Sequence, residues 1–259
     1  MDAASHARLS PGLNHGRNWI PATYYCTHAL GPIMYITDTR PVKVNGFVIT
    51  HCDDDPVHQL SIRQNDAASM IALRMDHGSV VKLLQVYLRG HGVWVRVHGS
   101  RGAMENLRHG NRSELYVRQE NYHEDGEPVD EVYAPDFPEY AEEAEAAGHG
   151  GGDFFTNLHF ANAIRSGEPP YLDVYRGVAM SIIGLLAYRS ALDDSNTIDV
   201  PDLRTEAARA EYEDDDWSPD PTTRKEGDPF PSINGLREIG PEALNFAREV
   251  WRENGYEEN

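Results

Sequence analysis

A phenol, a hydroxyl and an imidazole come together in the short segment that runs from Tyr24 to Ile33. His28 can take or give a proton near neutral pH, because an unperturbed imidazole has a pKa of about 6.5. Tyr25 and Thr27 can hydrogen-bond a polyol without carrying charge. These residue types suit proton transfer at a hydroxyl group, although a helix start beside a histidine is also common as plain architecture.

The same segment predicts the start of a helix over residues 27–37. Thr27 suits the N-cap of that helix, because its hydroxyl can accept from the free N–H groups of the first turn. Gly31 and Pro32 are expected in the first turn, where a proline costs little. Cys26 is expected to be a small buried residue and not a nucleophile, since no neighbouring group would lower its pKa.

A second polar group marks the entrance to a later helix. His149 precedes three glycines, Gly150 to Gly152, which let a backbone approach a ligand closely. Asp153 is well placed to cap the helix, and it can also contact a ligand. Tyr175 begins a further apolar helix, where a buried phenol would need a hydrogen-bond partner, and Tyr140 is an additional candidate.

Composition limits the function classes. The 259 residues are 40% hydrophobic and 25% charged, with a formal net charge of −19. So acidic a chain disfavours nucleic acid and anionic membranes as partners. Its two cysteines are too few for a disulfide framework, and its start lacks the pattern of a signal peptide, so a cytoplasmic protein is expected. The histidines do not show the spacing of metal ligands, and no metal is predicted.

Motifs for nucleotide phosphates are missing from the sequence. There is no Gly-x-Gly-x-x-Gly after a strand and no Gly-x4-Gly-Lys-Ser/Thr. The run from Gly148 to Gly152 follows an acidic helix, over residues 140–147, and not a strand. Residues 121–147 are rich in Asp and Glu, which indicates a hydrated surface, with a cation site as the alternative.

Short apolar runs separated by turn residues predict an α+β fold with a mostly antiparallel sheet and helices packed on one face. Strands are expected over residues 42–52, 68–75, 80–88, 93–97, 114–119 and 197–200. Helices are expected over residues 153–165, 173–192 and 241–254. Gly46 is expected at a bulge. Residues 1–203 are predicted to form the main domain, and 204–259 an acidic tail, poorly ordered over 205–235, that ends in a helix.

Four motifs occur in a recognisable order. They are Tyr25-Cys26-Thr27-His28-Ala29-Leu30-Gly31-Pro32, His149-Gly150-Gly151-Gly152-Asp153-Phe154-Phe155, Asp173-Val174-Tyr175 and Val200-Pro201-Asp202-Leu203. This pattern resembles the C-terminal domain of the Gfo/Idh/MocA oxidoreductases, and it looks most like the branch of NAD-dependent glycosidases that act on N-acetylgalactosaminides. The chain departs from that family by lacking its Rossmann half and its Glu-Lys-Pro motif, and by having Cys26 where proline is usual.

The resemblance implies roles for particular residues. His28 matches the histidine that accepts or holds the proton of the sugar hydroxyl beside the transferred hydride, with Tyr25 at its side. Arg17 lies where this branch often carries a substrate-binding arginine, whose guanidinium suits polyol oxygens or a carboxylate. Substrate contacts are likewise implied for a set of further residues: Thr27, His149, Asp153 and Tyr175.

The resemblance also implies a function with two alternatives. In the first, the chain is the substrate-binding and oligomer-forming half of an NAD(P)-dependent sugar oxidoreductase or redox glycosidase. The NAD or NADP is held mainly by a Rossmann domain absent from this chain, either a separate subunit or a part lost by truncation, and copies pair through the open sheet face. In the second, the chain is a noncatalytic carbohydrate-binding or oligomerisation module.

Overall fold

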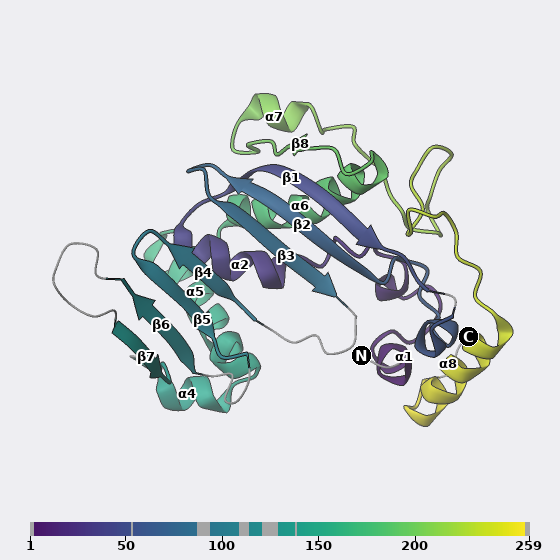
Figure 1. The fold of residues 1–259 in the computed structure, drawn as a ribbon, viewed down its shortest axis with the longest axis horizontal. Coiled ribbons are helices and arrows are strands. Elements are labelled where there is room, and N and C mark those ends of the chain that lie inside the picture. The colour runs from purple at the N-terminus through teal and green to yellow at the C-terminus, as the bar shows by residue number, and fades with distance from the viewer. Residues whose placement is uncertain are drawn as a thin grey trace. The chain divides into compact units, whose positions relative to one another are not determined.

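A computed structural model describes residues 3–52, 54–86, 94–108, 114–120, 129–137 and 139–256. They fall into two compact units. The first unit is Met1–His91 with Tyr175–Asn259, and the second is Gly92–Val174. Each unit contains a four-stranded sheet in which every described pair of strands is antiparallel (Figure 1). The predicted α+β class is therefore confirmed.

The sheet of the first unit has the order β3-β2-β1-β8. Its strands are β1 (Pro41–Ile49), β2 (Ala68–Met75), β3 (Val80–Val86) and β8 (Ile198–Asp199). Side chains alternate across it, because successive residues of a strand point to opposite faces. Val44, Leu73 and Ile71 are buried on one face, while Phe47 and Leu84 are exposed on the other. The predicted strand over residues 68–75 is confirmed in full.

Two helices cover the buried face of this sheet, as Figure 1 shows: α2 (Thr27–Thr37) and α6 (Val174–Leu192). They share one apolar core with the strands. The main buried members are Cys26, Leu30, Met34, Val44, Ile71, Leu73, Met75, Leu83, Ile183, Leu186, Ala187 and Val200. Because α2 carries the first polar motif, this core determines where that motif lies.

Glycines bring α6 unusually close to its neighbours. A Cβ at Gly46 of β1 would lie 1.9 Å from the Ala187 carbonyl oxygen, and a Cβ at Gly184 would lie 2.6 Å from the Tyr24 Cα. Gly46 itself pairs regularly with Ile71, and the irregularity in β1 lies between Pro41 and Lys43. The predicted bulge at Gly46 is therefore wrong, and this glycine serves close packing between helix and sheet.

The remaining helices of the first unit are short or terminal. They are α1 (Ala3–Leu9), α3 (Pro56–Gln59), α7 (Glu206–Ala210) and α8 (Pro241–Glu253), with a 3₁₀ turn, η1 (Gly16–Asn18). α1 and α8 pack side by side around Trp251, whose Nε1 donates to the Ala7 carbonyl at 2.9 Å (Figure 1).

Residues 205–235, for which the sequence predicts poor order, make specific contacts. The Arg189 guanidinium donates to both carboxylate oxygens of Asp215 at 2.6 and 2.7 Å. The Ser232 hydroxyl donates to buried Asp66 at 2.6 Å. Because α6 and the 61–67 segment hold this part of the chain, its acidic and proline-rich composition is compatible with a packed conformation.

The second unit contains the sheet β4-β5-β6-β7 and three helical segments. Its elements are β4 (Arg96–Gly99), β5 (Gly102–Asn106), β6 (Leu115–Gln119), β7 (Val129–Tyr133), α4 (Ala141–Ala146), the 3₁₀ turn η2 (His149–Gly151) and α5 (Gly152–Ser166). Strand β7 lies inside the acidic stretch and was not predicted. The predicted residues 87–88 and 93 lie outside the described residues.

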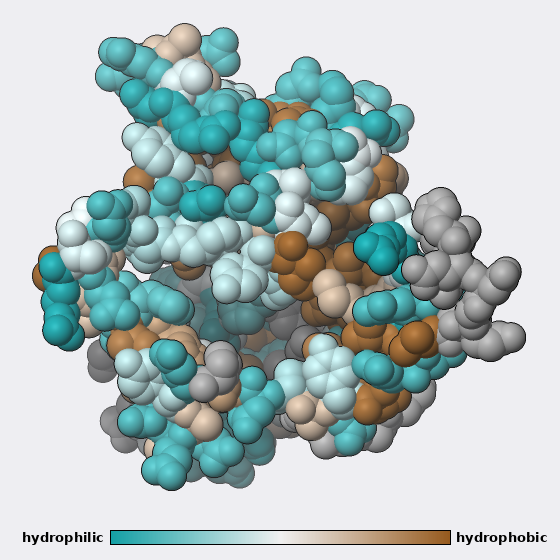
Figure 2. Space-filling view, turned by 90° about the vertical axis from the view of Figure 1, so that its left-hand side faces the viewer, coloured by the Kyte–Doolittle hydropathy of each residue, from teal (hydrophilic) through white to brown (hydrophobic). Residues whose placement is uncertain are grey.

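The surface agrees with the acidic composition. On the face drawn in Figure 2, hydrophilic residues predominate and hydrophobic residues form separate groups between them. Among the described residues, none of the helices is long and apolar enough to cross a membrane.

Two glycines of the same helix give a test of the packing. Gly184→Ala should lower the free energy of unfolding by about 1–3 kcal/mol, because the new Cβ would overlap backbone atoms of Thr23 and Tyr24. Gly177→Ala should raise it by about 0.5–1 kcal/mol, because nothing lies within 4 Å of its Cβ position and alanine favours a helix. Urea denaturation measures both. Equal effects of the two variants would contradict the close approach of α6.

Candidate functional site

Tyr25 and His28 form a stacked pair at the start of α2. Their ring centroids lie 4.7 Å apart with an interplanar angle of 23°. The Tyr25 Oη lies 3.4 Å from the His28 Nε2, a distance at which one group donates a hydrogen bond to the other. Both residues are exposed. The pair therefore presents a phenol and an imidazole together to a ligand that arrives from solvent.

The start of helix α2, which carries this pair, differs from the prediction. The N-cap of α2 is Cys26, with no side-chain capping bond, and Thr27 is the first helical residue. The predicted N-cap role of Thr27 is therefore wrong. Pro32 lies inside the helix, beyond the first turn. Because proline has no N–H, it cannot donate to the carbonyl of His28, four residues earlier.

Cys26, between Tyr25 and Thr27, packs into the core of the first unit. Its side chain is fully buried, and its Sγ lies 3.6 Å from the Met180 carbonyl oxygen of α6. Burial raises the pKa of the Cys26 thiol to about 11. The thiol therefore stays protonated near neutral pH, which agrees with its prediction as a buried residue and not a nucleophile.

Tyr175 lies at the opposite end of α2 from Tyr25 and His28. Arg176 of α6 pairs with Asp38, the residue after α2, at 3.2 Å. Gly184 packs against Tyr24 just before α2. The two helices thus run antiparallel, and the nine steps along α6 from Tyr175 to Gly184 correspond to a rise of about 13 Å. The phenol of Tyr175 is 48% exposed there.

Arg17 is exposed in η1, and its backbone N–H donates to the His15 Nδ1 at 3.2 Å. Burial, and to a lesser degree the Arg17 guanidinium, lower the pKa of His15. The described contacts do not join Arg17 to the Tyr25–His28 pair. Its substrate-binding role therefore stays a prediction, as does that of Thr27.

In the second unit, His149 and Asp153 form an ion pair across one helical turn. The His149 Nδ1 lies 2.9 Å from one Asp153 carboxylate oxygen and 3.0 Å from the other. The hydrogen bond from His149 to Asp153, and then the carboxylate charge, raise the pKa of His149. The N-cap of α5 is Gly151, so the predicted capping role of Asp153 is wrong. The i,i+4 spacing of a histidine and a carboxylate was the available signal for the pair.

The backbone around His149 adopts a sparsely populated conformation. His149, Gly150 and Gly151 have φ values of 55°, 61° and 92°. Tyr140, which precedes α4, also has a positive φ of 61°, and its ring lies 5.6 Å from the ring of Phe154. Non-glycine residues in this left-handed region are uncommon and cluster at functional sites. The strain marks His149 and Tyr140 as candidates in the second unit.

The predicted site residues thus fall into separate groups. The first unit brings Tyr25 and His28 together, and the second brings His149 and Asp153 together.

The described residues do not fit a dinucleotide site. Dinucleotide-binding folds are built on a parallel sheet with crossover helices, whereas every strand pair described here is antiparallel. The phosphate-binding glycine motif is also missing from the sequence. A search of the described residues for three or more clustered His, Cys, Asp or Glu side chains that could hold a metal gives no such group.

Comparison with known proteins identifies the class. The family model "Glycosyl hydrolase 109, C-terminal domain" matches residues 15–210. A glycosyl hydrolase family 109 protein of Stenotrophomonas maltophilia is 29% identical over 194 residues, which cover 74% of this chain and 40% of that protein. One of Shewanella pealeana is 38% identical over 63 residues, covering 24% of this chain and 14% of that protein.

Solved structures agree on the fold. Levoglucosan dehydrogenase, in a complex with NADH and L-sorbose, superposes with a TM-score of 0.53 at 19% identity, covering 73% of this chain and 50% of that one. An oxidoreductase domain protein from Kribbella flavida gives a TM-score of 0.53 at 15% identity, with 68% and 50% covered.

The fold is thus one that is also found in about half of the levoglucosan dehydrogenase chain. The family match over residues 15–210 shows that the chain belongs to the C-terminal domain family of glycosyl hydrolase family 109. It spans 40% of the length of its Stenotrophomonas relative and half the length of the levoglucosan dehydrogenase chain.

The ion pair in the second unit gives a pH test. Asp153→Asn should lower the pKa of His149 toward the ordinary value of about 6.5, because it removes the charged acceptor. The pair stabilises the fold while His149 is protonated, and this contribution is lost as the pH rises through the raised pKa. NMR titration of the His149 ring measures the shift. Glu143→Gln, which removes an exposed carboxylate from α4, is the control, and an equal shift in both variants would contradict the pairing.

Proposed function

We propose that this chain is the sugar-binding, C-terminal half of an NAD(P)-dependent redox glycosidase of family 109. The observation that carries the proposal is the exposed pair of Tyr25 and His28, with Oη and Nε2 3.4 Å apart, within the residues that the family model matches. The substrate class is a glycoside of an N-acetylhexosamine, in line with the relatives named as glycosyl hydrolases.

The chemistry assigned to this pair is the handling of a hydroxyl proton. His28 acts as a general base that accepts the proton of a sugar hydroxyl at Nε2, once that hydroxyl has replaced the Tyr25 phenol there, or it holds the hydroxyl by a hydrogen bond. Tyr25 stacks on the imidazole and restricts its rotation, and its phenol offers a second hydrogen bond to the same ligand. An exposed pair can exchange the proton with solvent after product leaves.

The redox cofactor lies outside this chain in the proposal. The antiparallel sheets of the described residues do not offer a dinucleotide-binding fold, so a nucleotide-binding domain must supply the NAD or NADP. Isothermal titration calorimetry of the purified chain with NAD should show no saturable heat of binding. Tight NAD binding by the same folded preparation would contradict the assignment.

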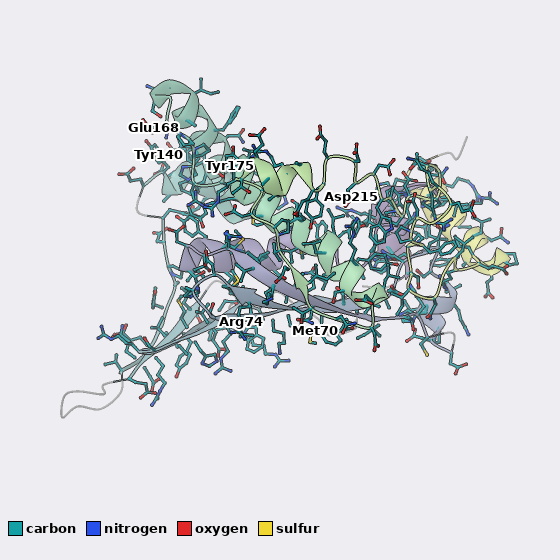
Figure 3. The ribbon with its side chains drawn as sticks, turned by 90° about the horizontal axis from the view of Figure 1, so that it is seen from above. Met70, Arg74, Tyr140, Glu168, Tyr175 and Asp215 are labelled. Carbon is teal, nitrogen blue, oxygen red and sulfur yellow. The ribbon has the colours of Figure 1, made fainter. Side chains whose placement is uncertain are left out.

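The sheet of the first unit offers the partner surface. Met70 and Arg74 project from the face of β2 opposite α6 (Figure 3). Phe47, Met70 and Leu84 lie side by side across β1, β2 and β3, and Phe47 and Leu84 are 42% and 45% exposed. We assign this apolar row to contact with a second copy of the chain, because a sheet face of this kind is typically covered.

Sugar binding by the chain alone tests the proposal. His28→Ala should weaken binding of a methyl N-acetylgalactosaminide about tenfold, because a hydrogen bond to the ligand is lost. Ligand-observed NMR with the purified chain measures the affinity. Tyr35→Ala is the matched control, since Tyr35 is an aromatic residue 67% exposed on the same helix. The assignment fails if His28→Ala binds like the wild-type chain, or if Tyr35→Ala loses as much affinity.

A further inference from the structure

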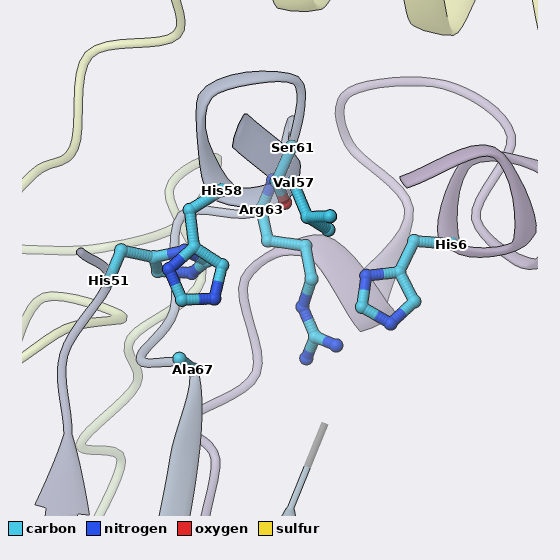
Figure 4. Close-up of a pocket in the computed structure, with 7 residues that line it drawn as sticks. All are labelled: His6, His51, Val57, His58, Ser61, Arg63 and Ala67. Carbon is cyan, nitrogen blue, oxygen red and sulfur yellow. The ribbon is translucent and has the colours of Figure 1, made fainter. Parts of the chain in front are cut away.

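A pocket in the first unit is lined by three histidines and a buried arginine. His6 comes from α1, His51 precedes α3, His58 lies in α3, and Arg63 follows α3 (Figure 4). These residues are separated in the sequence and are brought together by the fold. Arg63 is the residue of this group that carries a positive charge at neutral pH, in a chain whose formal net charge is −19.

His51 is the least satisfied group of the pocket. Both of its ring nitrogens are shielded from solvent and make no hydrogen bond of regular geometry with the described residues, and a looser contact with the Asn65 backbone only partly offsets the lowering of the His51 pKa. Burial, then the Arg237 charge, then His58, lower the pKa of His51 to about 3. Leaving a buried polar atom without a partner costs on the order of 1–3 kcal/mol. An unpaired group of this kind calls for an explanation such as a ligand.

The other side chains present donors to the same space. The His58 Nδ1 accepts from the Cys52 backbone N–H at 2.9 Å, so the ring proton of neutral His58 resides on Nε2. Arg63 is 5% exposed, and its Nε donates to the amide oxygen of Asn65 at 2.9 Å. In Figure 4 its guanidinium points between the His51–His58 pair, whose ring centroids are 4.6 Å apart, and His6.

The sign of the charge selects the kind of ligand. Arg237 donates to the backbone carbonyls of His58, Ser61 and Arg63, which fixes a second guanidinium behind the pocket. Arg237 and Arg63 both oppose a further positive charge on His51. A metal cation would meet the same repulsion, whereas an anion would be attracted.

We propose that this pocket binds a compact oxyanion, such as phosphate, sulfate or a carboxylate group, through the guanidinium of Arg63 and the imidazoles of His51 and His58. Guanidinium and imidazole N–H groups donate, and the anion oxygens accept. A bound anion gives the His51 ring an acceptor and stabilises its protonated form. The site is independent of the Tyr25–His28 pair and of sugar binding.

The test is an NMR titration of the histidine rings in the full chain. Inorganic phosphate is added against chloride at equal ionic strength. Saturable shifts are expected for His51 and His58, and none for His77, an exposed histidine outside the pocket. His51→Phe keeps a ring but removes both nitrogens, and it should raise the apparent Kd for phosphate about tenfold. His77→Phe is the matched control and should leave that Kd unchanged.

Parallel titrations with sulfate and acetate separate the sources of the anion. Tighter binding of phosphate and sulfate supports a free tetrahedral oxyanion, and tighter binding of acetate supports a carboxylate group. Shifts that do not saturate, or an equal Kd in the wild-type and His51→Phe chains, would overturn the proposal. If circular dichroism shows that His51→Phe is unfolded, the wild-type titration still decides, because it needs no variant.

Discussion

The close approach of α6 to its neighbours is the constraint on which the rest of the first unit depends. It is possible only because Gly46 and Gly184 lack a Cβ at the points where backbone meets backbone. The same contact holds the Thr23–Tyr24 segment, since the Thr23 hydroxyl donates to the Gly184 carbonyl at 2.8 Å. The residues that follow directly, Tyr25 and His28, are exposed side chains on a firmly packed support. Rigid support of this kind is what a binding site needs, because a loosely held pair would lose its geometry.

The Tyr25–His28 pair of the first unit and the His149–Asp153 pair of the second unit are held in different ways. In the first, burial and packing fix the backbone, and the imidazole of His28 stacks on the phenol of Tyr25. In the second, the backbone around His149 is strained, and a carboxylate charge holds the imidazole. Asp153 biases His149 toward its protonated form, a donor at both nitrogens, whereas the partner of His28 is a phenol.

The sequence predicted best what local pattern controls. The segments 68–75 and 27–37 form the predicted strand β2 and the predicted helix α2. The order of the four motifs indicated the family. Details of the helix starts were missed, because Thr27 and Asp153 have capping chemistry but lie one or two positions inside their helices. Contacts between distant segments were beyond any local pattern. The packing of residues 205–235 and the histidine pocket both depend on them.

The proposed function requires that a sugar contacts the exposed pair of Tyr25 and His28. Intermolecular nuclear Overhauser effects between a bound methyl N-acetylgalactosaminide and the aromatic ring protons of the full chain test this requirement most directly. The account predicts contacts from the bound ligand to the rings of both Tyr25 and His28. A bound ligand that gives contacts to neither ring would contradict it.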